Sequence, residues 1–131
     1  MNKKNINISI TIPLYNEEKN VDILYRELTD VFKSTDRRYE IIFVNDASKD
    51  LTWQKIANIA KHDKRVKAIN FKRNFGQTAA LSAAIESASG DIIIPMDGDL
   101  QNDPKDIPKL VKKIDQGYTV VSGWRKNRKD S

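Results

Sequence analysis

The sequence predicts an α/β fold in which helices cover both faces of a mostly parallel sheet, a three-layer αβα sandwich. Two observations predict it. Short segments rich in β-branched residues alternate with amphipathic segments of helical period, and the short segments are apolar throughout. Continuously apolar strands are buried on both faces, which is the usual state of strands in a parallel sheet. A chain of 131 residues is the size of one domain.

The first half of the chain is expected to form two strand–helix units. Residues 8–12 are β-branched and stop at Pro13, where a strand can end. Apolar residues then recur at the spacing of one helix face, which predicts a helix over residues 18–33 with Asn16 as its N-cap. The unit that follows is a strand at 40–45 and a helix at 51–62.

The second half is expected to repeat this pattern. The expected elements are a strand at 66–71, an alanine-rich helix at 78–87, a strand at 91–95, a helix marked by Ile107, Leu110, Val111 and Ile114, and a strand at 118–122. Asp103 and Pro104 suit the start of the last helix, because Asp caps helices and Pro is tolerated in the first turn. We expect residues 1–123 to form one domain, followed by a basic segment at 124–131.

The composition excludes several kinds of protein. The chain has no cysteine, so disulfide frameworks and thiolate metal sites are excluded. Its longest apolar stretches, 41–44 and 92–96, are far shorter than the ~20 residues of a membrane helix. The formal net charge of +5 favours anionic partners such as phosphates, nucleic acid or an acidic membrane surface. The basic segment alone is typical of a solvated terminus.

Polar residues follow each of the first four expected strands. In an open parallel sheet, ligands bind beyond the carboxyl ends of the strands. The residues that carry chemistry should therefore lie just after strands. The candidate segments at those positions are 13–17, 46–50, 73–76 and 97–101.

Asp97, Gly98 and Asp99 are the sharpest candidates, because they follow a buried strand directly. In extended backbone, residues i and i+2 point the same way, so both carboxylates can converge, and Gly98 keeps the space between them open and lets the chain turn. Adjacent carboxylates attract a divalent cation, and oxygen ligands suit Mg²⁺ or Mn²⁺. Gln101 could add an amide oxygen or fix the geometry. The alternative is a turn whose acids cap the next helix, but Asp103 already suits that role.

Two further segments are candidates for nucleotide contacts. Asp46 follows a strand and can accept hydrogen bonds from a nucleobase or from ribose; the alternative is an Asx turn or cap formed with Ser48. Arg73 and Gly76 precede a helix start, where free N–H groups and a fixed positive charge suit a pyrophosphate. The chain has neither a P-loop signature nor a GxGxxG motif, so the ordinary mononucleotide and dinucleotide interpretations lack their central residues.

Together these segments resemble the motifs of the family-2 glycosyltransferases, whose fold is the Rossmann-like GT-A sandwich. The resemblance is to the polyprenyl-phosphate glycosyltransferases in particular, which include dolichol-phosphate mannosyltransferase. It covers nearly the whole chain, with the motifs in the same order. The matching segments are 13–18 (Pro-Leu-Tyr-Asn-Glu-Glu), 44–50 (Val-Asn-Asp-Ala-Ser-Lys-Asp), 73–80 (Arg-Asn-Phe-Gly-Gln-Thr-Ala-Ala) and 95–101 (Pro-Met-Asp-Gly-Asp-Leu-Gln).

The resemblance implies a role for each matching position. The residues that would hold the base and ribose of a nucleoside-diphosphate sugar are Pro13, Tyr15, Glu17 and Asp46. The residues that would hold the metal bridging the donor diphosphate are Asp97, Asp99 and Gln101, with further donors to the diphosphate from Arg73 and the N–H groups near Gly76. A basic pair that faces the phosphate of the donor or of the lipid acceptor is matched by Arg125 and Arg128.

The implied reaction moves a hexose to a polyprenyl phosphate with inversion, in cell-envelope glycan synthesis. We prefer UDP-hexose over GDP-mannose as the donor. A metal at Asp97 and Asp99 would stabilise the departing diphosphate. No carboxylate base for a hydroxyl acceptor is visible, but a phosphate acceptor is already mostly anionic at neutral pH. Arg125 and Arg128 would then position the acceptor in place of base catalysis.

Two departures from the family pattern affect these expectations. Asn45 and Ala47 replace a frequent Asp and Gly, which would weaken nucleoside contacts while Asp46 remains. Members usually continue into an acceptor-binding region and membrane-associated segments. We therefore expect this chain to be the N-terminal part of a longer protein at the cytoplasmic face of the membrane.

Other functions are alternatives. A sugar nucleotidyltransferase needs a glycine-rich, arginine-containing loop after the first strand, where this chain has residues 13–17 instead. A nucleotide-sugar-binding fragment without turnover and an inverting transferase to a saccharide hydroxyl both stay open. Nucleic-acid binding rests on charge alone and lacks a recognition motif, so no nucleic-acid partner is expected.

Overall fold

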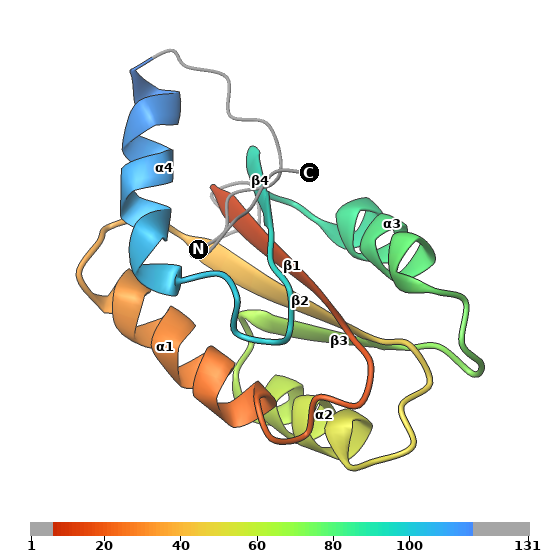
Figure 1. Ribbon diagram of the computed structural model, residues 1–131. Coiled ribbons are helices and arrows are strands. Elements are labelled where there is room, and N and C mark those ends of the chain that lie inside the picture. The colour runs from red at the N-terminus through yellow and green to blue at the C-terminus, as the bar shows by residue number, and fades with distance from the viewer. Residues whose placement is uncertain (1–6, 117–131) are drawn as a thin grey trace.

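The computed structural model describes residues 7–116 as a sheet covered by helices (Figure 1). Its strands are β1 (Ile8–Leu14), β2 (Tyr39–Asn45), β3 (Val66–Asn70) and β4 (Ile92–Pro95). Its helices are α1 (Val21–Lys33), α2 (Thr52–His62), α3 (Gln77–Ser87) and α4 (Ile107–Asp115), with a 3₁₀ turn, η2 (Pro104–Asp106), before α4. The strand expected at 118–122 and the basic segment with Arg125 and Arg128 lie outside the described residues. No helix in the described part of the chain is both long and apolar enough to cross a membrane.

Every strand pairing within residues 7–116 is parallel, in the order β3-β2-β1-β4. The chain runs outward from β1 to β2 and β3 and then crosses back to place β4 on the other side of β1 (Figure 1). Ligands of open α/β sheets bind at such a change of direction, outside the carboxyl ends of the strands. The predicted α/β class with a parallel sheet is confirmed, and the switch point lies between β1 and β4.

The two faces of the sheet carry cores of different size. Alternate residues of β1, such as Ile10 and Ile12, pack against α1, α2 and α4 in the larger core. On the other face, Ile42 and Val44 of β2 pack against α3. That helix can approach the sheet closely because its buried residues are alanines, Ala80 and Ala84. Helices on both faces of the sheet make the predicted three layers.

Helix α1 begins at Val21, later than expected, and the prediction that Asn16 is its N-cap is wrong. Asn16 has a left-handed backbone, with φ of 53°. Its side-chain oxygen accepts a hydrogen bond from Lys49 N at 2.8 Å, and its own N–H donates to Ser48 Oγ at 2.8 Å. The loop after β1 is therefore bound to the loop after β2 rather than to the helix that follows it.

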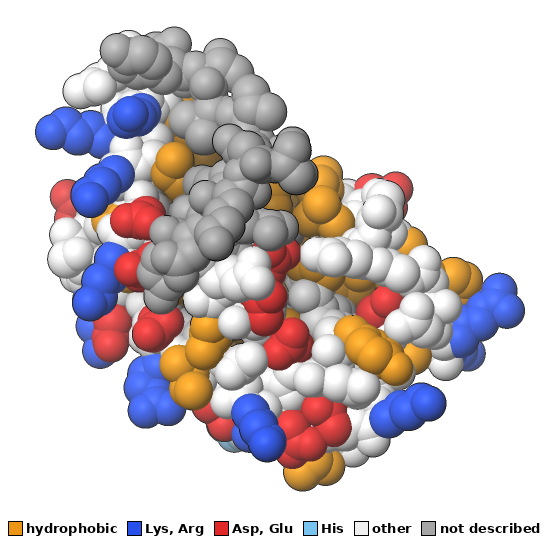
Figure 2. Space-filling model, viewed as in Figure 1, with side chains coloured by type: hydrophobic (Ala, Val, Ile, Leu, Met, Phe, Trp, Pro, Cys, Tyr) orange, Lys and Arg blue, Asp and Glu red, His pale blue; other side chains and the backbone are white. Residues whose placement is uncertain are grey.

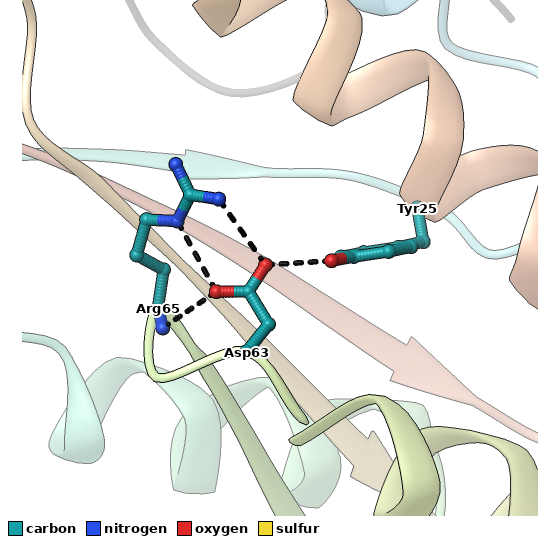
Figure 3. A network of polar contacts seen from close by, with 3 residues as sticks. All are labelled: Tyr25, Asp63 and Arg65. Atoms are coloured by element: carbon teal, nitrogen blue, oxygen red, sulfur yellow. Dashed lines mark hydrogen bonds and ion pairs between the residues drawn. The ribbon is translucent and has the colours of Figure 1, made fainter. Parts of the chain in front are cut away.

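A polar network attaches α1 to the turn between α2 and β3 (Figure 3). The Tyr25 hydroxyl donates to Asp63 Oδ2 at 2.6 Å, and Arg65 Nε donates to Asp63 Oδ1 at 3.1 Å. Burial and the bond to Asp63 raise the pKa of Tyr25 to about 12. The Arg65 guanidinium also lies over the Tyr39 ring, 4.9 Å from its centre. This network holds together elements at the amino end of β3, away from the carboxyl edge.

A buried carboxylate connects several elements at the same end of the sheet. Glu40 is 2% exposed, and its Oε2 accepts hydrogen bonds from Ser9 Oγ and Ser89 N, each at 2.6 Å. Lys67 Nζ lies 3.0 Å from Oε1 and donates to Ser87 O at 2.7 Å. Burial alone would raise the pKa of Glu40, but the hydrogen bonds outweigh it and lower the pKa. Glu40 thus ties the α3–β4 connection to three neighbouring strands.

Candidate functional site

A cavity of about 460 Å³ opens at the carboxyl edge of the sheet, between the ends of β1 and β4. Its walls come from the loops after all four described strands and from the first turn of α3. The predicted site residues that line it are Pro13, Tyr15, Glu17, Asp46, Gly76, Asp97, Asp99 and Gln101. Gly98, predicted to keep the space between the two aspartates open, also lines it. The lining residues without a predicted role are Leu14, Asn74, Gln77 and Ala80. One cavity therefore unites segments that are far apart in the sequence.

Gly98 allows the turn after β4 to approach the end of β1. A Cβ atom at this position would overlap Leu14 Cδ2 and lie 3.3 Å from Glu17 Cγ. The positive φ of this turn falls on Leu100, at 66°, so Gly98 is required for space. Because Gly98 has no side chain, the turn lies against the end of β1, and Asp97 lines the same cavity as Pro13 and Leu14.

Asp97 and Asp99 are both held by neighbouring groups. Asp97 N donates to the side-chain oxygen of buried Asn102 at 2.7 Å, and Gln77 Nε2 donates to Asp97 Oδ1 at 3.2 Å. Gln101 N donates to Asp99 Oδ1 at 3.1 Å. A different acid caps the 3₁₀ turn η2 that precedes the next helix, because Asp103 Oδ1 accepts from Lys105 N. The N-cap of α4 itself is Asp106, which makes no side-chain cap bond, so the prediction that Asp103 caps the helix holds only for η2. Asp97 and Asp99 thus line the cavity without capping that helix.

Asp46 holds the loop before α3. It is 4% exposed, and its two carboxylate oxygens accept hydrogen bonds from Phe75 N at 2.8 Å and Gly76 N at 3.0 Å. The alternative of an Asx turn with Ser48 is wrong for Asp46, because Ser48 N donates to Asn45 Oδ1 instead, at 3.2 Å. Gly76 has φ of 96° and ψ of 163°, a region that only glycine adopts readily. Asp46 and Gly76 together determine where α3 begins.

The two departures from the family pattern have structural consequences. Asn45 is 2% exposed and does not line the cavity; its amide donates to Asn70 Oδ1 at 2.8 Å. Ala47 has φ of 59°, in the left-handed region. This backbone costs a residue with a Cβ about 1–2 kcal/mol, so a glycine would fit here without strain.

Replacing Ala47 with glycine is expected to stabilise the chain by about 0.5 kcal/mol. Relief of about 1–2 kcal/mol of backbone strain is partly offset by the greater freedom of glycine in the unfolded chain, about 0.5–1 kcal/mol. Urea unfolding of both proteins measures the difference. Ala57→Gly on α2 is the control and should lose about 1 kcal/mol. A loss of stability in Ala47→Gly would contradict the strain at this position.

Arg73 does not line the cavity. Its guanidinium lies over the Phe75 ring, 4.8 Å from the ring centre, and Phe75 makes an edge contact with Phe71 at 5.5 Å. The structure thus places Arg73 on the outer side of the loop that Asp46 holds. Its predicted contact with a diphosphate would require the side chain to leave Phe75.

Glu17 lies beside the carboxylates after β4. Burial and the negative charges of Asp99, Asp50 and Asp97 raise its pKa, while a hydrogen bond from Asn20 lowers it. The bond from Asn20 Nδ2 to Glu17 Oε1 measures 2.9 Å. The charges of Asp97 and Asp99 therefore act on Glu17, so its carboxylate belongs to the acidic group around the expected metal site as well as to the predicted nucleoside contacts.

The cavity is acidic although the chain as a whole is basic. Four carboxylates line it and no Lys or Arg of the described residues does; the acids are Glu17, Asp46, Asp97 and Asp99. Figure 2 shows acidic side chains near the middle of this view, with Lys and Arg largely around its margin. A diphosphate alone would be repelled by this wall, whereas a divalent cation would be attracted to it.

The donor set fits Mg²⁺ or Mn²⁺. Among the described residues, no group of three or more acidic, His or Cys side chains is arranged to enclose a metal ion. Asp97, Asp99 and Gln101 offer two carboxylates and one amide oxygen at the cavity wall. Mg²⁺ and similar ions keep several waters and are commonly held by one or two carboxylates together with substrate phosphates. An incomplete protein cage is what such shared ligation needs.

Comparison with known families identifies this arrangement. The family described as Glycosyl transferase family 2 matches residues 9–131. The chain belongs to this family. The match includes all four segments that form the cavity, so the glycosyltransferase assignment covers the site as well as the fold.

Two relatives of this glycosyltransferase chain are named as polyprenyl-phosphate enzymes. It is 41% identical over 132 residues to the dodecaprenyl-phosphate galacturonate synthase of Rhizobium johnstonii, covering 97% of this chain and 38% of the relative. It is 43% identical over 125 residues to the undecaprenyl-phosphate 4-deoxy-4-formamido-L-arabinose transferase of Pseudomonas fluorescens, covering 95% of this chain and 37% of the relative. The chain thus spans less than two fifths of the length of these two relatives.

Solved structures confirm the GT-A fold of this family member. Residues 1–349 of TarS of S. aureus, solved in complex with UDP, have a TM-score of 0.65 at 23% identity, over 84% of this chain and 32% of that fragment. Glucosyl-3-phosphoglycerate synthase of Mycobacterium tuberculosis, in complex with Mn²⁺ and UDP, has a TM-score of 0.63 at 24% identity, over 86% of this chain and 40% of that one. At these identities the likeness shows the fold alone.

Proposed function

We propose that this chain is the donor-binding part of a glycosyltransferase that moves a hexose from UDP-hexose to a polyprenyl phosphate with inversion. One observation carries the proposal: the cavity at the switch point is lined by four carboxylates and no described basic side chain. A nucleoside diphosphate would bind such a wall together with a divalent cation. The solved relatives named above with UDP, one of them also with Mn²⁺, support this class of donor.

The two ends of the cavity suit the two ends of the donor. Tyr15 is 45% exposed at the rim and offers an aromatic face to a nucleobase, beside Pro13. Asp97 and Asp99 lie at the end of β4, where the diphosphate would be placed. The first turn of α3, beginning at Gln77, turns the positive end of the helix dipole toward the same cavity, which favours an anion.

The residues of this chain would hold the leaving group in place. Asp97, Asp99 and Gln101 would hold Mg²⁺ or Mn²⁺, which supplies Lewis-acid stabilisation of the negative charge on the departing diphosphate. Asp46 keeps the N-terminus of α3 in position through Phe75 N and Gly76 N. Preorganised donors of this kind need no rearrangement as charge develops.

The names of the relatives support a polyprenyl-phosphate acceptor. A phosphate monoester has a second pKa of about 6, so its oxygen is mostly anionic at neutral pH and needs no base. That oxygen would form a bond to the anomeric carbon while the bond to the diphosphate oxygen breaks on the opposite face, which inverts the centre. Arg125 and Arg128 are the residues proposed to position the acceptor. A lipid acceptor would be held in a membrane, so the reaction would take place at the membrane surface. We propose that this surface is the cytoplasmic face.

Removal of divalent cations is expected to weaken nucleotide binding at least tenfold. Calorimetric titration of the chain with UDP and with GDP, each in Mn²⁺ and in EDTA, tests this and identifies the base. UDP is expected to bind more tightly than GDP. In Asp99→Ala the dependence on Mn²⁺ should disappear, whereas Asp30→Ala, which removes an exposed carboxylate from α1, should bind as the wild type does.

The outcomes separate the alternatives. Tighter binding of GDP would overturn UDP as the donor nucleotide while keeping the metal site. Equal binding in Mn²⁺ and EDTA would overturn the role of the acidic wall. Metal-dependent binding without transfer of sugar to undecaprenyl phosphate would mean that the chain binds the donor but does not turn it over.

A further inference from the structure

Three consecutive backbone N–H groups in the loop after β1 donate to side chains of the segment that follows β2. The pairs are Asn16 N with Ser48 Oγ at 2.8 Å, Glu17 N with Thr52 Oγ1 at 2.8 Å, and Glu18 N with Asp50 Oδ2 at 3.2 Å. The loop cannot leave its position without breaking several of these bonds together. Its course therefore depends on residues 48–52, which lie more than 30 positions further along the chain.

Thr52 is the buried member of this network. It is the first residue of α2, and it is 0% exposed. Its hydroxyl accepts from Glu17 N and donates to Asp50 Oδ1 at 2.6 Å, and the same Oδ1 accepts from Thr52 N at 2.9 Å. Burial alone would raise the pKa of Asp50, but the hydrogen bonds from Thr52 and Glu18 outweigh it and lower the pKa. An ionised carboxylate therefore sets the orientation of the Thr52 hydroxyl.

The residue that Thr52 holds is part of the cavity wall. Glu17 lines the cavity, whereas Thr52 and Asp50 do not. Glu17 is held at a second atom as well, because its Oε1 accepts from Asn20 Nδ2 at 2.9 Å. With its backbone and its carboxylate both bonded, Glu17 keeps a fixed place in the wall. An acceptor in a fixed place can discriminate between nucleobases, because their edges carry N–H donors at different positions.

From this geometry we infer that Thr52, oriented by Asp50, is a positioning residue that sets which nucleobase the cavity prefers. The inference rests on the proposed function, in which Glu17 contacts the nucleoside of the donor. Thr52 touches neither the donor nor the cation; it acts through the backbone N–H of Glu17. The expected metal ligands lie after a different strand, β4, so nucleobase preference and metal dependence should respond separately.

The test is calorimetric titration with UDP and with GDP, each in Mn²⁺ and in EDTA. Both nucleotides carry the same ribose and diphosphate, so the ratio of their affinities reports on the base. Thr52→Val removes the hydroxyl and keeps the branched shape, whereas Thr52→Ser keeps the hydroxyl. Thr29→Val is the matched control, because it removes a hydroxyl that donates to Arg26 O on α1, outside the cavity lining.

We expect Thr52→Val to reduce the preference for one nucleotide over the other about tenfold, the factor that one well-formed hydrogen bond contributes. Thr52→Ser and Thr29→Val should keep the wild-type preference. The ratio of affinities in Mn²⁺ and in EDTA should stay unchanged in all three variants. A variant that was merely less stable would lose affinity for both nucleotides equally and would keep the wild-type preference.

A second variant tests the same network at a less buried position. Asp50→Ala removes the acceptor that orients the Thr52 hydroxyl, and it should reduce the preference in the same direction. A wild-type preference in Thr52→Val, or in Asp50→Ala where Thr52→Val does not fold, would overturn the role of Thr52. Equal affinity of the wild type for UDP and GDP would overturn it too. With Mn²⁺-dependent binding, both results leave the proposed function standing. If the wild-type chain binds neither nucleotide, the proposed function fails and the inference with it.

Discussion

Replacing Glu40 with alanine is expected to lower the free energy of unfolding by about 3–5 kcal/mol, the usual cost of removing one partner from a buried ion pair. The carboxylate is 2% exposed and accepts bonds from Ser9 and Ser89, with Lys67 3.0 Å from its other oxygen. In the variant these donors lose their partner, and a buried donor without a partner costs about 1–3 kcal/mol. Urea unfolding followed by circular dichroism measures the change.

Two comparisons separate the effect of losing the buried ion pair from the effect of removing any glutamate side chain. Glu27→Ala removes an exposed glutamate from α1 and should change stability by less than about 0.5 kcal/mol. The wild type should lose stability as the pH falls: Glu40 has a lowered pKa when folded, so the unfolded chain binds more protons below its ordinary pKa. Glu40→Ala should lose part of this acid dependence. If Glu40→Ala were as stable as Glu27→Ala, the network would contribute nothing.

The sequence contains a signal that Glu40 has a buried partner, although the partner itself is not predicted from it. Glu40 was expected to begin a strand buried on both faces, and a charge inside such a strand needs a partner. Lys67 lies in the adjacent strand, where Ile42 pairs with it in the parallel register. The register that brings the two charges together depends on pairing across 27 positions, from 40 to 67, which local pattern alone does not specify.

The order and type of the described elements were predictable, because the apolar strands and amphipathic helices differ in period. The boundaries of the elements were less predictable. Strand β1 does not stop at Pro13 but continues to Leu14. Its pairing with β4 ends at Thr11, opposite Pro95, so Pro13 lies where β1 has only β2 beside it. A proline is tolerated in such an edge-like stretch, and this depends on the length of another strand.

The position of the site was predictable from the rule that ligands bind beyond the carboxyl ends of parallel strands, but side-chain partners were not. Asp46 contacts backbone groups 29 and 30 residues away. Arg73 packs on Phe75 instead of lining the cavity. Gln77 belonged to a predicted segment without a role, although its position at a helix start beside the site was a usable signal. Contacts between loops depend on tertiary geometry that the sequence pattern leaves undetermined.

Replacing Gly98 with alanine is expected to affect both the fold and the site. The new Cβ would overlap Leu14 Cδ2, and Leu14 is 2% exposed, so its side chain cannot move outward into water. Overpacking of a core costs about 1–3 kcal/mol. The turn must then move away from β1 and carry Asp97 and Asp99 with it. We therefore expect a loss of stability in urea unfolding and loss of the Mn²⁺-dependent part of nucleotide binding in calorimetry.

A double-mutant cycle with Leu14→Val shows whether this overlap is the cause. Valine lacks the Cδ2 atom that the new Cβ would meet, so the cost of Gly98→Ala should be smaller in the Leu14→Val background. Residues in direct contact show interaction energies of about 0.5–3 kcal/mol in such cycles, and recovery of Mn²⁺-dependent binding should accompany the recovered stability. Strictly additive effects on stability, or a Gly98→Ala protein that binds Mn²⁺ and nucleotide as the wild type does, would show that the close approach of β1 and the β4 turn does not position these carboxylates.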